Sequence, residues 1–221
     1  MCAVVDIAQP FVPASTPVWG RSRDLPRVAS TLPESESLDE AHEFNLLRRV
    51  ADRDTAAYRE LVDAHLPRIA RFAERLLGNR AESEDVAQET FMKLWTSAAT
   101  FTPQARPSTW LYRIAHNACI DRLRKRRAET ELGESTAAAD RPSGLFARKQ
   151  TSEAVQKALA ELPERQRAAL TLVHYEGLSG DEAAAVLEIS VEALESLLAR
   201  GRRALRESLR ALAASPTKES P

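Results

Sequence analysis

The stretch "GDEAAAVLEISVEALESLLARGRRAL", residues 180–205, decides the fold of the C-terminal half of the chain. Apolar residues recur at helical spacing on both sides of Leu187 to Ile189, and Ser190 is a preferred residue at the start of a second helix. Two helices joined by such a tight turn have the layout of a helix-turn-helix. An ordinary helical hairpin in a bundle would show the same pattern.

The second of these helices carries an unexpected charge pattern. Glu192 and Glu195 stand in its middle, where a helix set against phosphates would carry cations, and arginines gather near its end. The two glutamates could accept hydrogen bonds from cytosine amino groups, pair with Arg200 or its neighbours, or face a protein. We expect the helix to lie on DNA, with its later arginines at the phosphates.

The composition favours an all-α protein without catalytic chemistry. Of the 221 residues, 43% are hydrophobic and only 7 are glycine, and the abundant Ala, Leu, Glu and Arg are strong helix formers. The four histidines are scattered, the two cysteines lack metal-site spacing, and catalytic motifs are missing. We therefore predict no enzyme activity, no catalytic or metal-binding residues and no cofactor.

The charge and hydropathy patterns limit where the protein can be located and which partners it can bind. A net charge of -1 means that any contact with nucleic acid must come from local segregation of charge. The N-terminus lacks the basic start of a signal peptide, and charged residues interrupt every apolar run before it reaches about 18 residues. We expect a cytoplasmic protein without membrane insertion.

Residues 106–127 show such segregation, because they hold seven cations and one acid. Phe101, Trp110 and Tyr112 lie in or beside this block, and aromatic faces next to a basic groove suit unstacked bases. Trp110 and Tyr112 are two positions apart on a helix and so lie on different faces, which predicts that at least one is available to a ligand or partner. The alternative is a solvated helix end whose cations are favoured by the helix dipole.

Breaks in the helical patterns divide the chain. Pro67 is expected to kink or split one helix, and Gly78 to end it. The prediction is two small helical domains joined by a flexible linker. The parts are a disordered extension (1–40), the first domain (41–127), an acidic linker (128–150), the second domain (151–212) and a tail (213–221).

Three segments together resemble a known family. They are "DVAQETFMKLW" (85–95), "RPSTWLYRIAHNACIDRLRKRR" (106–127) and "LPERQRAALTLVHYEGLSGDEAAAVLEISVEALESLLARGRRAL" (162–205). Their order and spacing resemble bacterial RNA polymerase sigma factors of the extracytoplasmic-function (ECF) group, over about 44–127 and 151–212.

The resemblance implies an initiation subunit of RNA polymerase. A region-two-like domain would bind core polymerase and open the minus-ten promoter element, and a region-four-like helix-turn-helix would read the minus-thirty-five element. The implied partners are core RNA polymerase and promoter DNA, both duplex and melted. Many members of the group are held inactive by an anti-sigma factor, which implies such a partner here.

The resemblance also assigns surfaces by position. Core polymerase would bind a face on which an exposed Met stands beside Gln and Lys, a combination that suits a partner groove, although an ordinary polar surface is the alternative. This face consists of Asp85, Gln88, Glu89, Met92 and Lys93.

The minus-ten element would meet the basic and aromatic block, with the loop 96–108 resembling one that cradles a flipped base. Stacking and a pocket would offset an unstacking cost of roughly a few kcal/mol per base. The residues are Phe101, Trp110, Tyr112, Arg113, Asn117, Asp121, Arg122, Arg124 and Lys125.

The minus-thirty-five element would meet the second helix of the helix-turn-helix. Related proteins commonly carry basic residues where Glu195 and Leu197 stand, so we expect an atypical sequence preference. The residues are Ser190, Glu192, Glu195, Ser196, Arg200, Arg202 and Arg203.

The linker carries Glu129, Glu131, Glu134 and Asp140 and no cation over residues 128–140. In the resembling proteins this segment threads the polymerase cleft, where its negative charge could mimic nascent RNA. An ordinary solvated linker is the alternative.

Two other functions remain open from the sequence. A helix-turn-helix regulator that binds duplex DNA without polymerase would explain 180–206 only. A sigma-like adaptor that sequesters an anti-sigma factor would use the same helices to bind protein.

Overall fold

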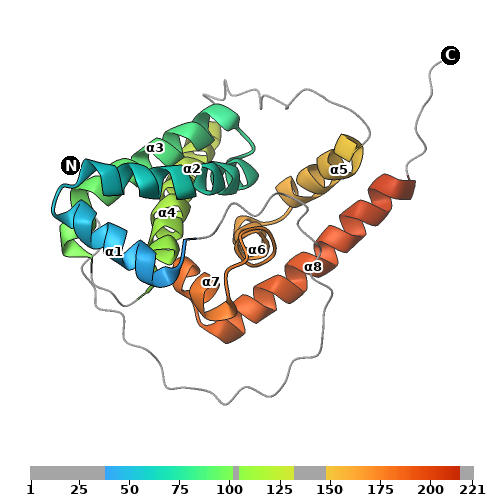
Figure 1. Cartoon of the computed structure of the whole chain (residues 1–221). Coiled ribbons are helices and arrows are strands. Elements are labelled where there is room, and N and C mark those ends of the chain that lie inside the picture. Colours follow the sequence, from blue (N-terminus) through green and yellow to red (C-terminus); the bar gives the residue numbers. More distant parts are fainter. Residues whose placement is uncertain (1–37, 102–104, 132–147, 215–221) are drawn as a thin grey trace. The chain divides into compact units, whose positions relative to one another are not determined.

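The computed structural model describes residues 38–101, 105–131 and 148–214, and these residues form helices and short connections without a strand (Figure 1). The all-α prediction is confirmed. Almost all of the predicted extension, the middle of the linker and the last seven residues lie outside the described residues. The elements are α1 (Glu40–Ala51), α2 (Thr55–Leu77), α3 (Arg80–Ser97), η1 (Ala98–Thr100), α4 (Pro107–Glu131), α5 (Arg148–Ala160), α6 (Glu164–Leu170), η2 (Thr171–Tyr175), α7 (Gly180–Leu187) and α8 (Val191–Ala214).

Capping residues set the boundaries of the long helix α2. The Asp54 carboxylate accepts hydrogen bonds from the backbone amides of Ala56 and Ala57 at its start. Gly78 ends it in the left-handed conformation with φ 66°, as predicted. Pro67 does not divide the helix, because α2 runs unbroken from Thr55 to Leu77.

The helices α1, α3 and α4 pack against the buried apolar face of α2. Leu61, Ile69 and Phe72 are buried on one face of α2. Phe72 meets Tyr112 of α4 edge to face, with ring centroids 5.4 Å apart. This apolar face of α2 therefore holds α1, α3 and α4 in place.

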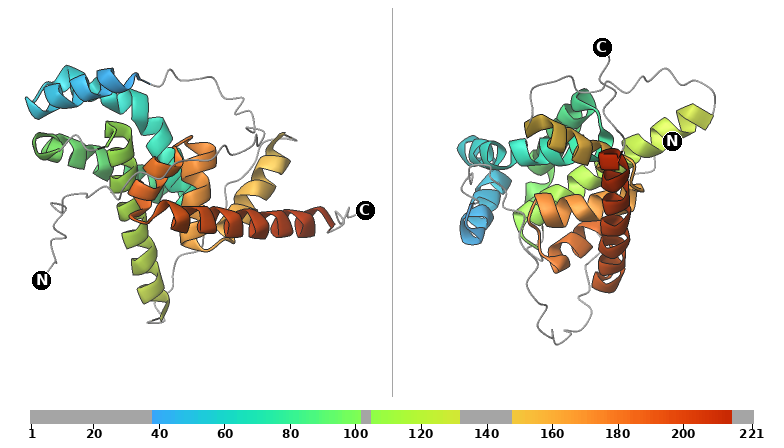
Figure 2. Two further views of the ribbon diagram at one scale, coloured as in Figure 1. Left: turned by 90° about the horizontal axis from the view of Figure 1, so that it is seen from below. Right: turned by 90° about the vertical axis from the view of Figure 1, so that its right-hand side faces the viewer.

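The C-terminal helices form the predicted helix-turn-helix. Ser179 and Glu182 make reciprocal hydrogen bonds that begin α7, which is a capping box. Glu188 turns the chain with φ 54°, and the Ser190 hydroxyl accepts from the amide of Ala193 to begin the next helix. That helix, α8, runs unbroken past α6 and α5 (Figure 2).

The helices on the two sides of the linker belong to one compact unit, which spans 33–221. In it α4 packs against α7, and α2 contacts α5, α6 and η2. The helices on the two sides of the linker therefore touch directly.

The helix before the linker is longer than predicted. α4 continues to Glu131, three residues beyond Ala128, where the linker was expected to start. Lys125 pairs with Glu129, and the Thr130 hydroxyl donates to the carbonyl of Arg126, so the last turn is supported from within. Likewise α5 begins at Arg148 rather than at 151.

Candidate nucleic-acid and polymerase interface

One face of α3 carries the five residues predicted to bind core polymerase. All five are exposed, and Met92 has 68% of its surface accessible. The opposite face packs into the core through Val86, Phe91 and Leu94. An exposed methionine on a rigid helix leaves an adaptable apolar contact within a polar surface, which suits a partner groove.

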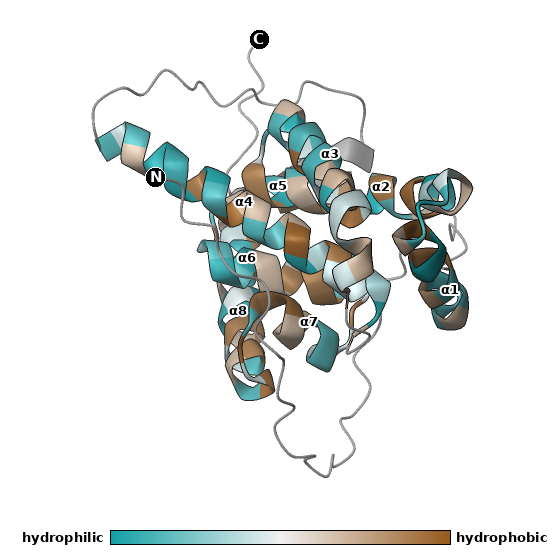
Figure 3. Cartoon of the chain, turned by 90° about the vertical axis from the view of Figure 1, so that its left-hand side faces the viewer, coloured by the Kyte–Doolittle hydropathy of each residue, from teal (hydrophilic) through white to brown (hydrophobic). Residues whose placement is uncertain are grey.

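A second exposed stripe runs along α4. Asn117, Asp121, Arg124 and Lys125 are exposed at helical spacing, and Arg113 continues the stripe half-buried. Figure 3 shows mostly hydrophilic residues on the last turns of this helix. The stripe can contact an extended polar chain over about three turns.

Acids neutralise most of the basic block at residues 106–127. Six of its seven cations pair with carboxylates in the described structure, and Arg113 is the exception. The exposed pairs are worth little energy, so phosphates can replace those carboxylates at small cost. The pairs join Arg106 to Glu40 and Glu182, Arg122 to Glu89, Arg124 to Asp121, Lys125 to Glu129, Arg126 to Glu82 and Arg127 to Glu164.

Both predicted stacking residues of α4 are buried, which contradicts the expectation that one would be available. Trp110 is 8% exposed and packs on Phe101, with ring centroids 5.0 Å apart. Tyr112 is 1% exposed between Phe72 and Glu176. Spacing along one helix could not reveal this, because Phe101 of the preceding loop covers Trp110 and Glu176, 64 positions away, covers Tyr112.

Burial also changes the chemistry of these side chains. The low-dielectric surroundings of Tyr112 raise the pKa of its phenol well above the usual value, and the nearby charge of Glu176 raises it further. Burial raises the pKa of the Cys119 thiol to about 12, which makes this cysteine unreactive.

Most of the α8 residues predicted to meet the minus-thirty-five element are exposed. Glu192, Glu195, Ser196, Arg200 and Arg203 are exposed, whereas Arg202 is half-buried and the Ser190 hydroxyl is used in the helix cap. The Arg200 guanidinium donates to the Ser196 hydroxyl at 2.7 Å. No ion pair joins Glu195 to Arg200 among the described residues, which leaves this glutamate available to a partner.

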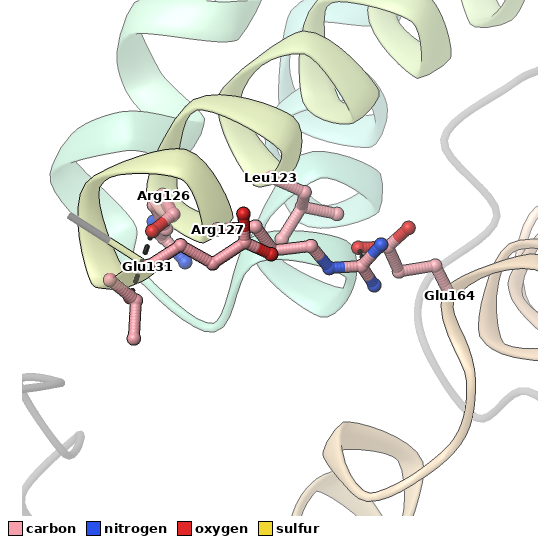
Figure 4. Close-up of a pocket in the computed structure, with 6 residues that line it drawn as sticks. Leu123, Arg126, Arg127, Glu131 and Glu164 are labelled. Carbon is pink, nitrogen blue, oxygen red and sulfur yellow. Dashed lines mark hydrogen bonds and ion pairs between the residues drawn. The ribbon is translucent and has the colours of Figure 1, made fainter.

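A shallow hollow lies between α4 and α6 (Figure 4). Arg127 reaches across it to Glu164, with 2.9 Å between nitrogen and oxygen. In the part of the chain that the structure describes, no three His, Cys, Asp or Glu side chains gather as a metal ion would need. The hollow is lined by Leu123, Arg126, Arg127, Thr130, Glu131 and Glu164.

Sequence reasoning missed a polar cluster between the two helical domains. Glu176, directly after η2, is buried against Arg68 and Arg75 of α2 and Tyr112 of α4. Over a hundred positions separate Glu176 from the two arginines along the chain, so local patterns contain no signal for this contact.

Two family models match the chain, one over the segment that carries the α3 and α4 surfaces and one over the segment that carries α8. Sigma-70 region 2 matches residues 61–129, which include the α3 face and the α4 stripe. Sigma-70, region 4, matches residues 152–205, which include the helix-turn-helix. The ECF RNA polymerase sigma factor SigW of Bacillus subtilis is 31% identical over 179 residues, covering 75% of this chain and 96% of SigW.

The chain belongs to the ECF group of RNA polymerase sigma factors.

A second sigma factor matches over a similar length of the chain. The RNA polymerase sigma-H factor of Pseudomonas aeruginosa is 31% identical over 188 residues, covering 79% of this chain and 97% of that protein. The resemblance read from the three sequence segments is thereby confirmed. Among the described residues, none of this sigma factor's helices is both long and apolar enough to cross a membrane.

Solved structures share the fold. CnrH, solved in complex with the cytosolic domain of CnrY, matches with a TM-score of 0.62 and 27% identity over 77% of this chain and 98% of CnrH. RpoE from Bartonella quintana, solved with the anti-sigma factor NepR, matches with a TM-score of 0.59 and 26% identity over 69% of this chain and 96% of RpoE.

Proposed function

We propose that this sigma factor binds core RNA polymerase and directs it to promoters, where it reads two DNA elements and melts one of them. The observation that carries the proposal is the exposure of three faces on separate helices, α3, α4 and α8, within the two segments that match sigma region 2 and region 4. Each face has the chemistry that its role requires. We propose no enzyme activity, and we place the protein in the cytoplasm with its polymerase.

The α3 face binds core polymerase. Its residues Asp85, Gln88, Glu89, Met92 and Lys93 combine one apolar anchor with polar neighbours, as protein interfaces do. Met92 is the apolar residue of the face, and 68% of its surface is accessible. It is therefore the residue whose truncation costs polymerase affinity without loss of the fold.

The α4 helix meets the minus-ten element. Asn117, Asp121, Arg124 and Lys125 contact the strand with the partly covered Arg113 and Arg122. Phe101, Trp110 and Tyr112 supply stacking surface for bases taken out of the duplex. Because Trp110 and Tyr112 are buried in the free chain, promoter melting includes a step that uncovers them.

The α8 face reads the minus-thirty-five element. Arg200, Arg202 and Arg203 hold phosphates at the C-terminal part of the contact, and Ser190 and Ser196 add polar contacts. Glu192 and Glu195 accept hydrogen bonds from cytosine amino groups, which makes the sequence preference atypical.

An anti-sigma factor controls access to these faces. Support comes from CnrH and from RpoE of Bartonella quintana, because RpoE was solved with an anti-sigma factor and CnrH with the cytosolic domain of CnrY. The partner would cover the α3 face or the DNA-binding faces and so compete with polymerase and promoter.

Transcription with purified components tests the proposal. The full chain is added to core polymerase and a promoter library, and specific transcripts are sequenced. Met92→Ala should weaken core binding about tenfold or more, whereas Glu84→Ala, a change outside the face on the same helix, should not. Duplex binding without polymerase-dependent transcripts would instead identify a DNA-binding regulator, and the absence of both activities would identify an adaptor.

A further inference from the structure

Glu176 lies at the centre of a polar cluster that joins the two helical domains. Its side chain is 3% exposed. One carboxylate oxygen lies 3.1 Å from an Arg75 nitrogen, and the other accepts a 2.7 Å hydrogen bond from the Tyr112 hydroxyl and lies 3.8 Å from Arg68 Nε. Arg68 also donates to the Glu176 backbone carbonyl at 2.7 Å.

The three groups that hold this carboxylate all belong to the first helical domain. Arg68 and Arg75 are seven positions apart on α2 and so share one face of the helix. The Tyr112 ring lies beside them, 6.0 Å from the Arg68 guanidinium carbon. Among the described residues, Glu176 is the only acid paired with either arginine.

Without Glu176, this cluster is a site for an oxyanion. Two guanidinium groups and a phenolic hydroxyl all donate hydrogen bonds, and the arginine fork fits phosphate as well as carboxylate. The site has two positive charges and no acid of its own to balance them. Arg68 and Arg75 would be left half-buried and unpaired, which favours capture of another anion.

The position of the site on the fold indicates which anion. Tyr112 directly precedes Arg113, the half-buried first member of the α4 stripe, so the site lies at the same end of α4 as the path proposed for the promoter strand, about 100° around the helix from Arg113. A nucleic-acid strand presents a phosphate at every nucleotide along that path. A carboxylate tethered within the same chain has an effective concentration of roughly millimolar or more, and can therefore compete with such a phosphate.

We propose that Arg68, Arg75 and Tyr112 form a binding site for a backbone phosphate of the melted promoter strand, and that Glu176 occupies this site in the free chain. The inference rests on the proposed function, because the phosphate belongs to the promoter strand that this sigma factor is proposed to contact. Withdrawal of Glu176 frees the phosphate site and uncovers Tyr112 in a single step. Other contacts, including the hydrogen bond from Arg167 to the Leu76 carbonyl at 2.6 Å, join the same two domains.

Binding of single-stranded DNA to the full free chain tests this site. The probe is a fluorescein-labelled oligodeoxynucleotide of mixed sequence, measured by anisotropy over a series of salt concentrations. Glu176→Gln should bind about tenfold more tightly than the original chain. The plot of log affinity against log salt should also steepen, by about 0.7 for one added phosphate contact.

Two matched controls isolate the site from general charge effects. Asp63→Asn removes one exposed negative charge from α2 and should leave binding nearly unchanged. In the Glu176→Gln background, Arg75→Ala should abolish the gain, whereas Arg71→Ala, an exposed arginine of the same helix, should preserve most of it. The same oligonucleotide with uncharged methylphosphonate linkages should show no gain.

Several results would overturn the proposal: equal affinities of Glu176→Gln and Asp63→Asn, a gain that survives Arg75→Ala, or a gain with the uncharged backbone. If Glu176→Gln fails to fold by circular dichroism, Glu176→Asp should show a smaller gain in the same direction. Promoter-specific transcription by the original chain is assayed in parallel. Its absence overturns the proposed function, whereas normal transcription with no gain in strand binding overturns only the phosphate site.

Discussion

The carboxylate of Glu43 and the imidazole of His65 lie 3.1 Å apart, and each side chain is 4% exposed. The second carboxylate oxygen of Glu43 faces the backbone amide of Ser108, at 3.4 Å. Burial raises the pKa of Glu43, but His65 and Ser108 outweigh it, so the pKa lies below its usual value. One buried pair therefore joins α1, α2 and the beginning of α4, just before Trp110.

Removal of Glu43 should be costly. Glu43→Ala leaves His65 buried without its partner and should lower the free energy of unfolding by about 3 kcal/mol, measured by urea titration. The matched control is Glu60→Ala, which breaks the exposed pair with His42, whose side chains are 46% and 45% accessible. That change should cost less than about 1 kcal/mol, and equal losses would contradict the prediction.

His116 should make stability depend on pH in mild acid. Burial lowers its pKa to about 4, so the unfolded chain binds more protons than the folded chain between about pH 6.5 and pH 4. This contribution is complete above about pH 6.5 and is lost as the pH falls towards 4, with a slope of at most about 1.4 kcal/mol per pH unit.

The measurement is the difference in unfolding free energy between the original chain and His116→Gln across this range. A difference is needed because Glu43, Asp54 and Glu192 also have lowered pKa values, so their protonation in acid destabilises the folded chain in both variants. A difference that stays constant from pH 7 to about pH 4 would count against the buried neutral imidazole.

Gly201 permits the close approach of α6 to α8. A Cβ atom at this position would lie 2.9 Å from Cδ1 of Leu170. Gly201→Leu should therefore lower the free energy of unfolding by about 1–3 kcal/mol through overpacking. Ala199→Leu, at an exposed position of the same helix, should stay within about 0.5 kcal/mol, and thermal unfolding of both variants decides.

A positive and a negative residue of the α8 face, Arg203 and Glu195, should affect DNA binding differently. Arg203→Ala should weaken binding to all duplexes alike and reduce the salt slope by about one. Glu195→Lys should change the preferred base at one minus-thirty-five position, with a discrimination of about 1–3 kcal/mol. Selection of promoters from a random library measures both effects, and two unchanged profiles would make α8 a packing helix.

Local chemistry made much of the fold predictable. Gly78 and Ser190 mark the end of α2 and the start of α8 because left-handed backbone favours glycine and helix starts favour a hydroxyl. The exposed face around Met92 follows from helical periodicity alone. The role of that face came from family resemblance, since an ordinary polar helix surface has the same pattern.

Contacts between distant segments were beyond local reasoning. The burial of Tyr112 depends on Glu176, 64 positions away, and neither neighbourhood signals the other. Glu43 is buried because His65 and Ser108 supply its partners, and the sequence around Glu43 contains no signal for either contact. In both cases the tertiary partner decides the outcome.

The π-helix η2 gives the fold an unusual sensitivity to chain length. Its five residues, Thr171–Tyr175, directly precede Glu176, whose amide donates to the carbonyl of Thr171 five positions back. Each residue advances an α-helix by about 100°, so deletion of one residue here would restore α-helical spacing and turn position 176 away from Arg75. The phase of a single helical turn thus determines whether the two halves of this sigma factor meet through a carboxylate.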